Sequence, residues 1–471
     1  MAEDLHALGI AALGARLRAR TLSAADLADH AIARHARFGA SLNAYKHFDA
    51  ETARAAARAA DDAFARGREL GPLQGIPVSI KDLFGVAGMP IFGGSPKRLP
   101  ANFETEGSIM RRLRAGGAVI VGKAHTVEFA FDGLGVNQHW GAPVNPWCAT
   151  EHRMTGGSSS GAGVSLYEGS AWLSIGTDSG GSVRMPSAWS GAVGLKMTQG
   201  RWALDGLVPC SPTLDSPGPI ARSVEDCLLA FAALDPRTDA TATLAAARAA
   251  KVGDATIGVP DAHFWDDADA GVVRAVEAAL AELGRAGATI KRMAFPEATC
   301  AHDEAVGKII SYVEFRGCME PDLAAWWDSF GPILKGRMSG TDDPRAIPAT
   351  TYFHALERQR ALAAAARLRF EGLDVIACPT VVSSPPREDE VRTLEAYVGP
   401  NRRVHRNTYL VNVLGLCALS MPVGLDARGM PVGLQLIAAP GREERLLACA
   451  LAFERVLGTP AERIGTPARV R

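Results

Sequence analysis

Two segments rich in glycine and serine, separated by an apolar segment at 164–175, constrain this chain more than any other feature. The first segment is TGGSSSG at 155–161, and the second is GTDSGGSVR at 176–184. Glycine permits positive φ angles and a close approach of the backbone, so consecutive N–H groups can point into one small space. Donors arranged in this way stabilise an oxyanion. The two segments therefore predict loops that hold an oxyanion beside serine hydroxyls.

A serine nucleophile needs a base, and no histidine lies within or between these segments. The candidate base is Lys81, which lies upstream in GIPVSIKD at 75–82. Apolar residues alternate through 76–80 after a turn signal at 73–75, a pattern typical of a buried strand. Partial desolvation at the end of that strand favours a neutral amine, which acts as a general base at neutral pH. A lysine whose ammonium group reaches the surface from the strand end is the alternative.

These motifs together resemble the amidase signature family, and the resemblance runs from about residue 71 to residue 437. The matching blocks, in order, are GIPVSIKD (75–82), GAVIVGK (117–123), EFA (128–130), GAPVNPW (141–147), GGSSSG (156–161), GTDSGGSVRMP (176–186), GAVGLK (191–196), LDSPGP (214–219), DVIACP (374–379), NVLGLCALSMP (412–422) and GLQ (433–435). The chain is therefore identified as a member of that family. Membership implies an α/β fold in which a mixed central β-sheet is sandwiched between layers of α-helices.

The resemblance implies a catalytic triad of Ser182, Ser158 and Lys81. Ser182 is the implied nucleophile, Ser158 the bridging residue that follows a cis peptide bond, and Lys81 the base. Lys81 would take a proton from Ser158, Ser158 would take one from Ser182, and Ser182 would attack the carbonyl carbon of an amide. Water would then hydrolyse the acyl-enzyme, giving a carboxylic acid and ammonia or an amine.

The segment around the implied nucleophile also contains the groups expected to form an oxyanion hole and a charge pair. The implied oxyanion hole consists of the backbone N–H groups of Ser179, Gly180, Gly181 and Ser182. Asp178 and Arg184 flank the nucleophile, and we expect them to form a charge pair that shapes the turn. Their expected role is structural, because a guanidinium group is a poor proton donor.

Two other nucleophile motifs fit the same residues less well. Residues 157–161 match the G-x-S-x-G elbow with Ser159 at its centre, but an elbow must follow a strand. The preceding residues, 143–153, contain two prolines and many polar residues. DSGG at 178–181 is similar to the active-site turn of chymotrypsin-like proteases, with Ser179 as nucleophile. The alanine-rich helical stretches of this chain argue against the all-β fold of those proteases.

Composition narrows the class of protein further. A net charge of −1 gives no support for contact with nucleic acid. Eight cysteines without C-x-x-C pairs indicate reduced thiols in the cytoplasm, and the histidines lack metal-binding spacing. We find no signal peptide and no apolar run of membrane-spanning length. The expectation is a cytoplasmic enzyme without cofactor or metal, acting on a small-molecule amide.

The chain is predicted to form a single domain in which an N-terminal helical segment, residues 1–70, packs on the catalytic body at 71–471. Apolar spacing suggests one buried face in that segment, packed on the body or on a partner subunit of a homodimer, formed by Leu5, Leu8, Leu13 and Leu17. Ser23 is the predicted N-cap of a helix at 24–37. The other predicted elements are helices at 49–66, 224–234 and 268–286, strands at 119–121, 251–259 and 289–293, and an exposed connection at 236–252. Residues 319–348 are predicted to be irregular, forming either a pocket wall or ordinary surface packing.

The predicted substrate-binding residues are mostly apolar. They are Phe131, His139, Trp140, Ser159, Met185 and Trp202. An apolar wall formed by Phe129, Phe131, Trp140, Met185 and Trp202 favours an aryl or aliphatic amide over a charged one.

Two alternatives to a free-standing amidase remain open. One is the A subunit of a glutamyl-tRNA(Gln)/aspartyl-tRNA(Asn) amidotransferase, which acts as a glutaminase. Met185 stands where that subunit typically has glutamine, and WALDG at 202–206 departs from its usual Ser-Arg-Tyr-Gly run. The other alternative is a non-catalytic partner protein with the same fold, against which the presence of Lys81, Ser158 and Ser182 argues.

Overall fold

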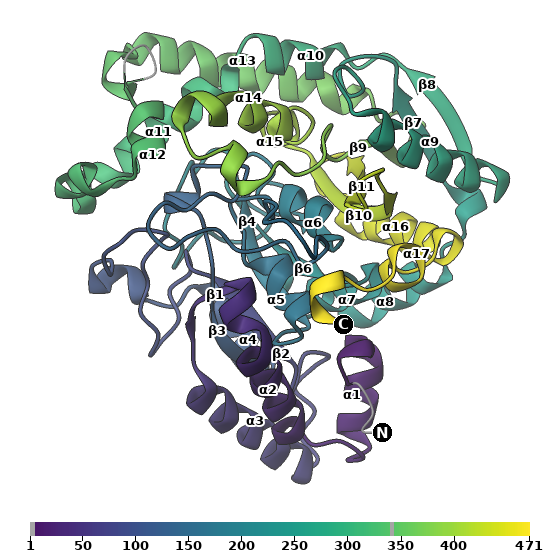
Figure 1. Cartoon of the computed structure of the whole chain (residues 1–471). Coiled ribbons are helices and arrows are strands. Elements are labelled where there is room, and N and C mark those ends of the chain that lie inside the picture. Colours follow the sequence, from purple (N-terminus) through teal and green to yellow (C-terminus); the bar gives the residue numbers. More distant parts are fainter. Residues whose placement is uncertain (1–4, 340–342) are drawn as a thin grey trace.

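An 11-stranded mixed β-sheet runs through the described part of the chain (Figure 1). The computed structural model describes residues 5–339 and 343–471. The strands are β1 (Tyr45–Phe48), β2 (Pro77–Lys81), β3 (Val119–Ala124), β4 (Leu173–Asp178), β5 (Val193–Lys196), β6 (Ser216–Ala221), β7 (Thr256–Pro260), β8 (Thr289–Met293), β9 (Val375–Pro379), β10 (Cys417–Leu425) and β11 (Pro431–Ala438). Their spatial order is β1-β3-β2-β4-β6-β5-β10-β11-β9-β7-β8. The predicted α/β fold with a mixed central sheet is confirmed.

Parallel pairing is confined to two parts of this sheet. The parallel pairs are β2 with β3, β2 with β4, β7 with β8, and β7 with β9. All other neighbouring strands are antiparallel. Because β2 and β4 are parallel neighbours, their carboxyl ends lie at the same edge of the sheet.

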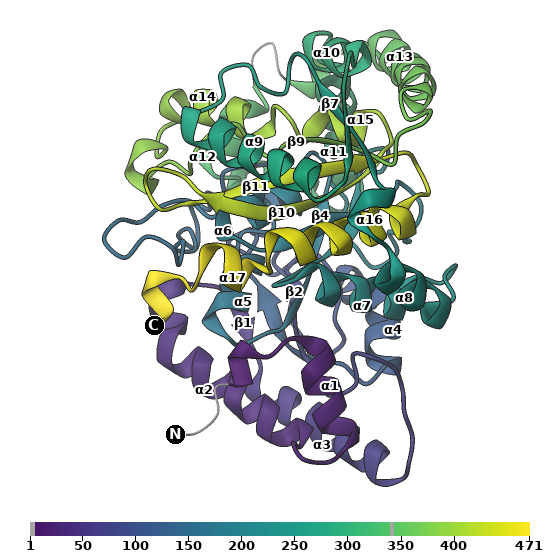
Figure 2. The same ribbon diagram turned by 90° about the vertical axis from the view of Figure 1, so that its right-hand side faces the viewer.

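Helices cover both faces of the sheet. They are α1 (Ile10–Arg18), α2 (Ala24–Leu42), α3 (Ala50–Ala65), α4 (Ser108–Ala115), α5 (Ala162–Glu168), α6 (Arg184–Ser190), α7 (Val224–Leu234), α8 (Ala240–Ala249), α9 (Ala270–Arg285), α10 (Pro296–Asp303), α11 (Val306–Leu323), α12 (Pro332–Arg337), α13 (Ala349–Leu368), α14 (Leu394–His405), α15 (Tyr409–Val413), α16 (Glu443–Leu457) and α17 (Pro460–Ile464). Figure 2 shows α16 running along β10.

Neighbouring residues of β5 show which helices lie on each face of the sheet. Val193 and Leu195 belong to a buried cluster that includes α7, α9 and α16. Gly194, between them, faces the opposite side, where a Cβ on this residue would lie 2.2 Å from Ser187 Oγ of α6. Successive residues of a strand point to opposite faces, so α6 and α7 lie on opposite faces of the sheet.

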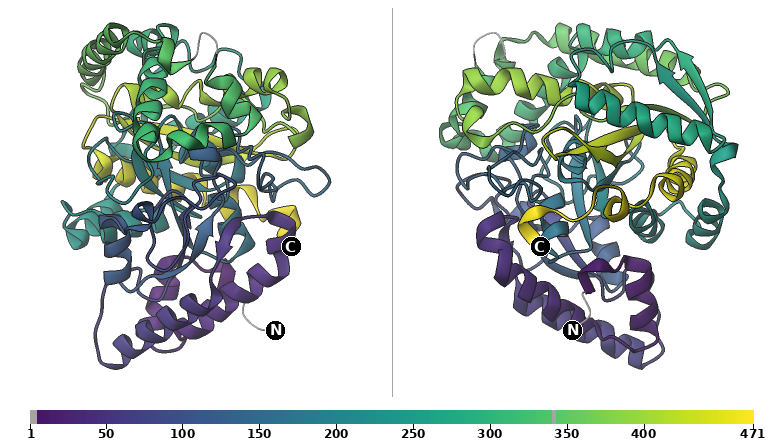
Figure 3. Two further views of the ribbon diagram at one scale, coloured as in Figure 1. Left: turned by 90° about the vertical axis from the view of Figure 1, so that its left-hand side faces the viewer. Right: turned by 45° about the vertical axis from the view of Figure 1, so that its right-hand side comes forward.

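The N-terminal helices pack against the rest of the chain. Both views of Figure 3 place α1, α2 and α3 at the end of the molecule opposite to α10 and α13. Leu13 and Leu17 are buried in the core, and Leu5 and Leu8 pack against it. Ser23 Oγ accepts a hydrogen bond from the Asp26 N–H, so the predicted N-cap of α2 is confirmed.

Several predicted elements agree with the structure and others do not. The helix at 224–234 and the strand at 289–293 match α7 and β8. The N-terminal segment predicted to be helical, residues 1–70, also contains the strand β1, which pairs with β3 at the edge of the sheet. The exposed connection predicted at 236–252 was wrong, because it contains α8. Alanine-rich sequence favours that helix, and the Asp239 side chain caps it by accepting from the Ala242 N–H.

The segment at 319–348 is more helical than predicted. It contains the end of α11, a 3₁₀ helix at Ala324–Ser329, α12 and a second 3₁₀ helix at Pro344–Ala346. Residues 340–342 of the predicted irregular segment lie outside the described residues. Phe330 packs with its ring centre 4.9 Å from that of Trp327, so these aromatic residues form local packing contacts.

Three further findings concern the described residues as a set. None of their helices has the length and apolar character needed to cross a membrane. The cysteines are free thiols. No group of three or more histidine, cysteine, aspartate or glutamate residues within 5–339 and 343–471 is arranged to hold a metal ion.

Two glycines, one in a crowded position of the sheet and one in an open position of a helix, test the packing of the described residues. A Cβ on Gly218 of β6 would lie 2.0 Å from the Leu195 carbonyl oxygen, whereas a Cβ on Gly317 of α11 would contact nothing within 4 Å. We expect Gly218→Ala to lower the free energy of unfolding by about 3 kcal/mol through overpacking. Gly317→Ala should raise it by about 0.5–1 kcal/mol, because alanine favours helix over glycine.

Urea denaturation followed by circular dichroism measures both changes. Equal midpoints for the two variants would contradict this assignment of the buried and open positions.

Candidate active site

Lys81 lies at the end of β2 and is fully buried. Its Nζ atom donates to Ser158 Oγ at 2.6 Å and to Thr177 Oγ1 at 2.7 Å. Thr177 belongs to β4, so its side chain reaches Lys81 because the two parallel strands end together. Sequence reasoning assigned no role to Thr177.

The environment of Lys81 favours the neutral amine. Burial lowers the pKa of Lys81 to about 7, although the carboxylates of Asp215 and Asp178 act in the opposite direction. The neighbouring carboxylate, Asp82, forms an ion pair with Lys123 at 2.9 Å. Lys81 is therefore next to hydroxyl acceptors, and a substantial fraction of it is unprotonated at neutral pH.

Ser158 lies in the first glycine-rich loop and is fully buried. The Gly157–Ser158 peptide bond is cis, as the family resemblance implied. The carbonyl oxygen of Ser158 accepts from the Val127 N–H at 3.2 Å and from Thr126 Oγ1 at 3.1 Å. These contacts fix the backbone of the loop where the Ser158 hydroxyl meets Lys81.

The two glycine-rich loops touch each other. The Ser159 N–H donates to the Ser182 carbonyl oxygen at 3.3 Å, and Ser159 Oγ donates to the Thr177 carbonyl oxygen at 3.3 Å. Ser159 is fully buried beneath the second loop. Ser182 itself is 3% exposed and lines a cavity. The structure thus joins Lys81 to Ser158 by a hydrogen bond and places the loop of Ser158 against the loop of Ser182, which lines the cavity.

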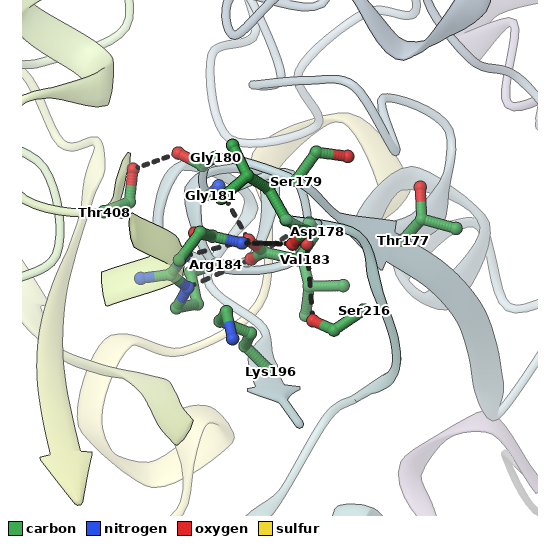
Figure 4. Close-up of polar contacts among 12 residues, drawn as sticks. Thr177, Asp178, Ser179, Gly180, Gly181, Val183, Arg184, Lys196, Ser216 and Thr408 are labelled. Atoms are coloured by element: carbon green, nitrogen blue, oxygen red, sulfur yellow. Dashed lines mark hydrogen bonds and ion pairs between the residues drawn. The ribbon is translucent and has the colours of Figure 1, made fainter. Parts of the chain in front are cut away.

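A buried ion pair between Asp178 and Arg184 supports the loop that carries Ser182 (Figure 4). The Asp178 carboxylate accepts from the Gly181 N–H at 2.7 Å, from the Val183 N–H at 3.2 Å and from Arg184 at 2.8 and 3.0 Å. Burial would raise the pKa of Asp178, but the adjacent guanidinium group of Arg184 holds it well below its ordinary value. The predicted charge pair is confirmed.

Two amide side chains extend this network. Arg184 donates to Gln435 Oε1 of β11 and to Asn412 Oδ1 of α15, both at 2.7 Å. Asn412 Nδ2 donates back to the carbonyl oxygen and carboxylate of Asp178, both at 2.9 Å. Both residues belong to blocks of the family resemblance, which was the only sequence signal for them.

The predicted oxyanion hole needs one correction. The Gly181 N–H already donates to Asp178, so in this arrangement it is not free to bind an oxyanion. The N–H groups of Ser179, Gly180 and Ser182 donate to no backbone or side-chain acceptor of the described residues. Ser179 and Gly180 also line the cavity.

Asp215 is a further buried carboxylate at this loop that the sequence did not single out. It accepts hydrogen bonds from Ser179 Oγ, from the Cys210 N–H at 2.9 Å and from the Ser211 N–H at 3.0 Å. Burial raises the pKa of Asp215 to about 6. Asp215 therefore orients Ser179 and adds negative charge near Lys81 once it is ionised.

The cavity in front of Ser182 has a volume of about 550 Å³. Its walls combine the second loop with side chains from α10, α11, α12 and α14. Among the lining residues are Phe131, Asp132, Ser179, Gly180, Ser182, Cys210, His302, Asp303, Lys308, Tyr312, Arg337, Tyr397, Asn401, Arg402, His405, Arg406 and Tyr409. The volume is in the range of small-molecule sites.

Of the six predicted substrate-binding residues, Phe131 lines this cavity and the other five do not. Met185 is fully buried below the second loop, where its terminal methyl group would lie 3.0 Å from a Cβ on Gly181. The N–H and hydroxyl groups of Ser159 form the hydrogen bonds between the two loops described above. These two residues support the loop from behind.

The remaining three residues lie away from the cavity lining. His139 Nε2 hydrogen-bonds Glu128 at 2.9 Å, and Trp140 Nε1 donates to the Ser95 carbonyl oxygen at 3.0 Å. Trp202 Nε1 donates to Asp235 at 3.1 Å and lines a different cavity, beside α4. Closeness to the motifs in sequence thus did not bring these three side chains to the cavity in front of Ser182.

Known proteins resemble the chain over almost its whole length. The Amidase family model matches residues 26–447. The 2-amino-5-chloromuconic acid deaminase of Comamonas testosteroni is 45% identical over 460 residues, which cover 98% of each chain. The A subunit of the glutamyl-tRNA(Gln) amidotransferase of Cupriavidus necator is 33% identical, with 95% of this chain and 96% of that protein covered.

A solved structure described as an amidase gives the same result in three dimensions. It superimposes with a TM-score of 0.85 at 28% identity, covering 96% of this chain and all of that one. Sequence and structure agree that this chain belongs to the amidase family of hydrolases that act on carbon–nitrogen bonds.

Proposed function

We propose that the chain hydrolyses a small amide through an acyl-enzyme on Ser182, with Lys81 as base and Ser158 as proton relay. The observation that carries the proposal is the 2.6 Å contact between Lys81 Nζ and Ser158 Oγ. Both side chains are fully buried behind the loop that presents Ser182 to the cavity. A neutral amine at that position can accept a serine proton without leaving a charge exposed to solvent.

The proposed reaction has two halves. In the first, Lys81 takes the Ser158 proton while Ser158 takes the Ser182 proton, and Ser182 Oγ bonds to the carbonyl carbon. Collapse of the tetrahedral intermediate breaks the C–N bond, and the proton returns from Lys81 through Ser158 to the leaving nitrogen. In the second half, water attacks the ester by the same relay, which releases the carboxylic acid and restores Ser182.

The relay requires a hydrogen bond between the two serine hydroxyl groups. Among the described residues no such bond joins Ser158 Oγ to Ser182 Oγ, although the loops touch through the 3.3 Å contact of Ser159 with Ser182. Rotation of the Ser182 side chain about χ1 closes the relay when a substrate occupies the cavity. Catalytic hydrogen bonds often tighten only in the substrate complex.

A free-standing enzyme is favoured over a component of an amidotransferase. The identity to the Comamonas deaminase is 45%, against 33% to the Cupriavidus amidotransferase component. The deaminase is named for a small acid that bears an amino group, so we propose ammonia as the nitrogen product here as well. Amide hydrolysis by the purified single chain, without any partner subunit, separates this proposal from the amidotransferase alternative and from a non-catalytic partner.

Replacement of the nucleophile tests the acyl-enzyme. Ser182→Ala should lower kcat for ammonia release by about 10⁴-fold or more, because the covalent step is lost. Ser187→Ala is the matched control, since Ser187 is a buried serine of α6 that donates only to the Val183 carbonyl oxygen. Added hydroxylamine should give a hydroxamate with the wild type and the control alone. Turnover retained in a folded Ser182→Ala variant would assign the nucleophile elsewhere.

The pH profile tests the base. Because the pKa of Lys81 is lowered to about 7, kcat/KM for a neutral amide should rise with pH and level off above pH 7. Asp215 raises the pKa of Lys81 by charge attraction, so Asp215→Asn should move the acid limb to lower pH. Asp205→Asn, at an exposed carboxylate, is the control and should leave the limb in place. A limb that stays fixed in Asp215→Asn would exclude Lys81 as its source.

A further inference from the structure

Positive charge predominates in the cavity in front of Ser182. Its lining holds four cationic side chains and two carboxylates: Lys308, Arg337, Arg402 and Arg406, against Asp132 and Asp303. Asp303 is exposed and hydrogen-bonds His302. A cavity with this balance raises the local concentration of anionic ligands. The positive charge of the cavity lining therefore argues against the uncharged amide substrate that the sequence favoured.

Arg337, the last residue of α12, is held inside the cavity by aromatic groups. Its guanidinium carbon lies 4.7 Å from the centre of the Phe131 ring and 5.9 Å from that of Tyr397. Nη1 donates to the Phe131 carbonyl oxygen and lies 3.4 Å from Tyr397 Oη. These contacts fix the plane of the guanidinium group, and none of them neutralises its charge.

The absence of an acidic partner distinguishes Arg337 from other arginines inside the molecule. Arg184 is paired with Asp178, and Arg201 is paired with three carboxylates. Within the described residues Arg337 forms no ion pair, although it is half-buried. Charges removed from water are normally paired. An anion supplied by a ligand would complete this one.

Asp132 attracts Arg337 at a distance but forms no ion pair with it among the described residues, because its carboxylate is engaged by other donors. It accepts from the N–H groups of the next turn, Leu134, Gly135 and Val136, at 2.8–3.0 Å, and from the Tyr397 hydroxyl group. Tyr397 stands between Asp132 and Arg337, contacting both. The carboxylate thus orients Tyr397 while the guanidinium group remains available to the cavity.

We propose that the substrate carries a free carboxylate, which Arg337 binds while the scissile amide lies against Ser182. This inference rests on the proposed amide hydrolysis and adds the substrate class. A planar guanidinium group binds a carboxylate through two parallel hydrogen bonds, which fixes orientation as well as charge. Both groups line one cavity of about 550 Å³, so the substrate is a small amide of a dicarboxylic acid or a comparable amino acid derivative.

Kinetics with two matched amides test the proposal. Succinamate carries a carboxylate where butyramide has a methyl group, and the wild type should prefer succinamate. Arg337→Gln should raise KM for succinamate by about 10- to 100-fold, the range expected for a charge-assisted hydrogen bond, and leave butyramide unchanged. Arg337→Lys keeps the positive charge but loses the paired N–H donors of the guanidinium group. Its KM for succinamate should lie between those of the wild type and Arg337→Gln.

The control is Lys335→Gln, which removes a positive charge from the same helix. Lys335 is exposed and donates to the Asp328 carbonyl oxygen, outside the cavity lining. Its removal should leave both substrates unaffected. A wild type that prefers butyramide, or an Arg337→Gln variant that loses both amides equally, would overturn the assignment.

Binding of succinate separates this inference from the proposed chemistry, because binding needs no turnover. In a Ser182→Ala background, calorimetry should show a Kd for succinate that rises by about 10- to 100-fold when Arg337→Gln is added. Equal affinity in the two proteins, or no binding to either, would refute the carboxylate site. If Ser182→Ala still hydrolysed succinamate, the proposed nucleophile would fail while the binding result stood on its own.

Discussion

The buried pair of Asp178 and Arg184 is the interaction on which the candidate active site most depends. Asp178 ends β4 and Arg184 begins α6, so the pair spans the turn that contains Ser182. Arg184 also binds Asn412 and Gln435, which attaches this turn to two segments more than 200 residues away in sequence. Removing one member of a buried pair typically costs about 3–5 kcal/mol. The position of Ser182, the proposed nucleophile, is therefore set by the fold as a whole.

The central sheet also determines the chemistry available to Lys81. A lysine on an exposed strand would stay protonated, whereas Lys81 is enclosed between β3 and β4 and contacts hydroxyl groups. Its immediate neighbour Asp82 is paired with Lys123, which keeps a direct counter-ion away from Lys81. Burial and the choice of ion-pair partners thus favour the neutral amine that the proposed general base requires.

Sequence predicted the framework of this molecule better than its cavity. Lys81 and Ser158 were paired through the resemblance, and the helix predicted at 224–234 has the limits of α7. Trp202 and Trp140 were misplaced because only the folded chain determines which surface an aromatic side chain faces. Arg337 carried no local signal, since an arginine at the end of a short helix is ordinary until its surroundings in space are known.

The cavity draws on two parts of the chain that are separate in sequence. Lys81, Ser158 and Ser182 come from the first 190 residues, while α10 to α12 and α14 provide most of the facing wall. Substitutions on that wall would leave the proposed proton relay and its supporting ion pair untouched. The architecture therefore allows selectivity to diverge by changes in one peripheral helical region, without altering the residues proposed to break the amide bond.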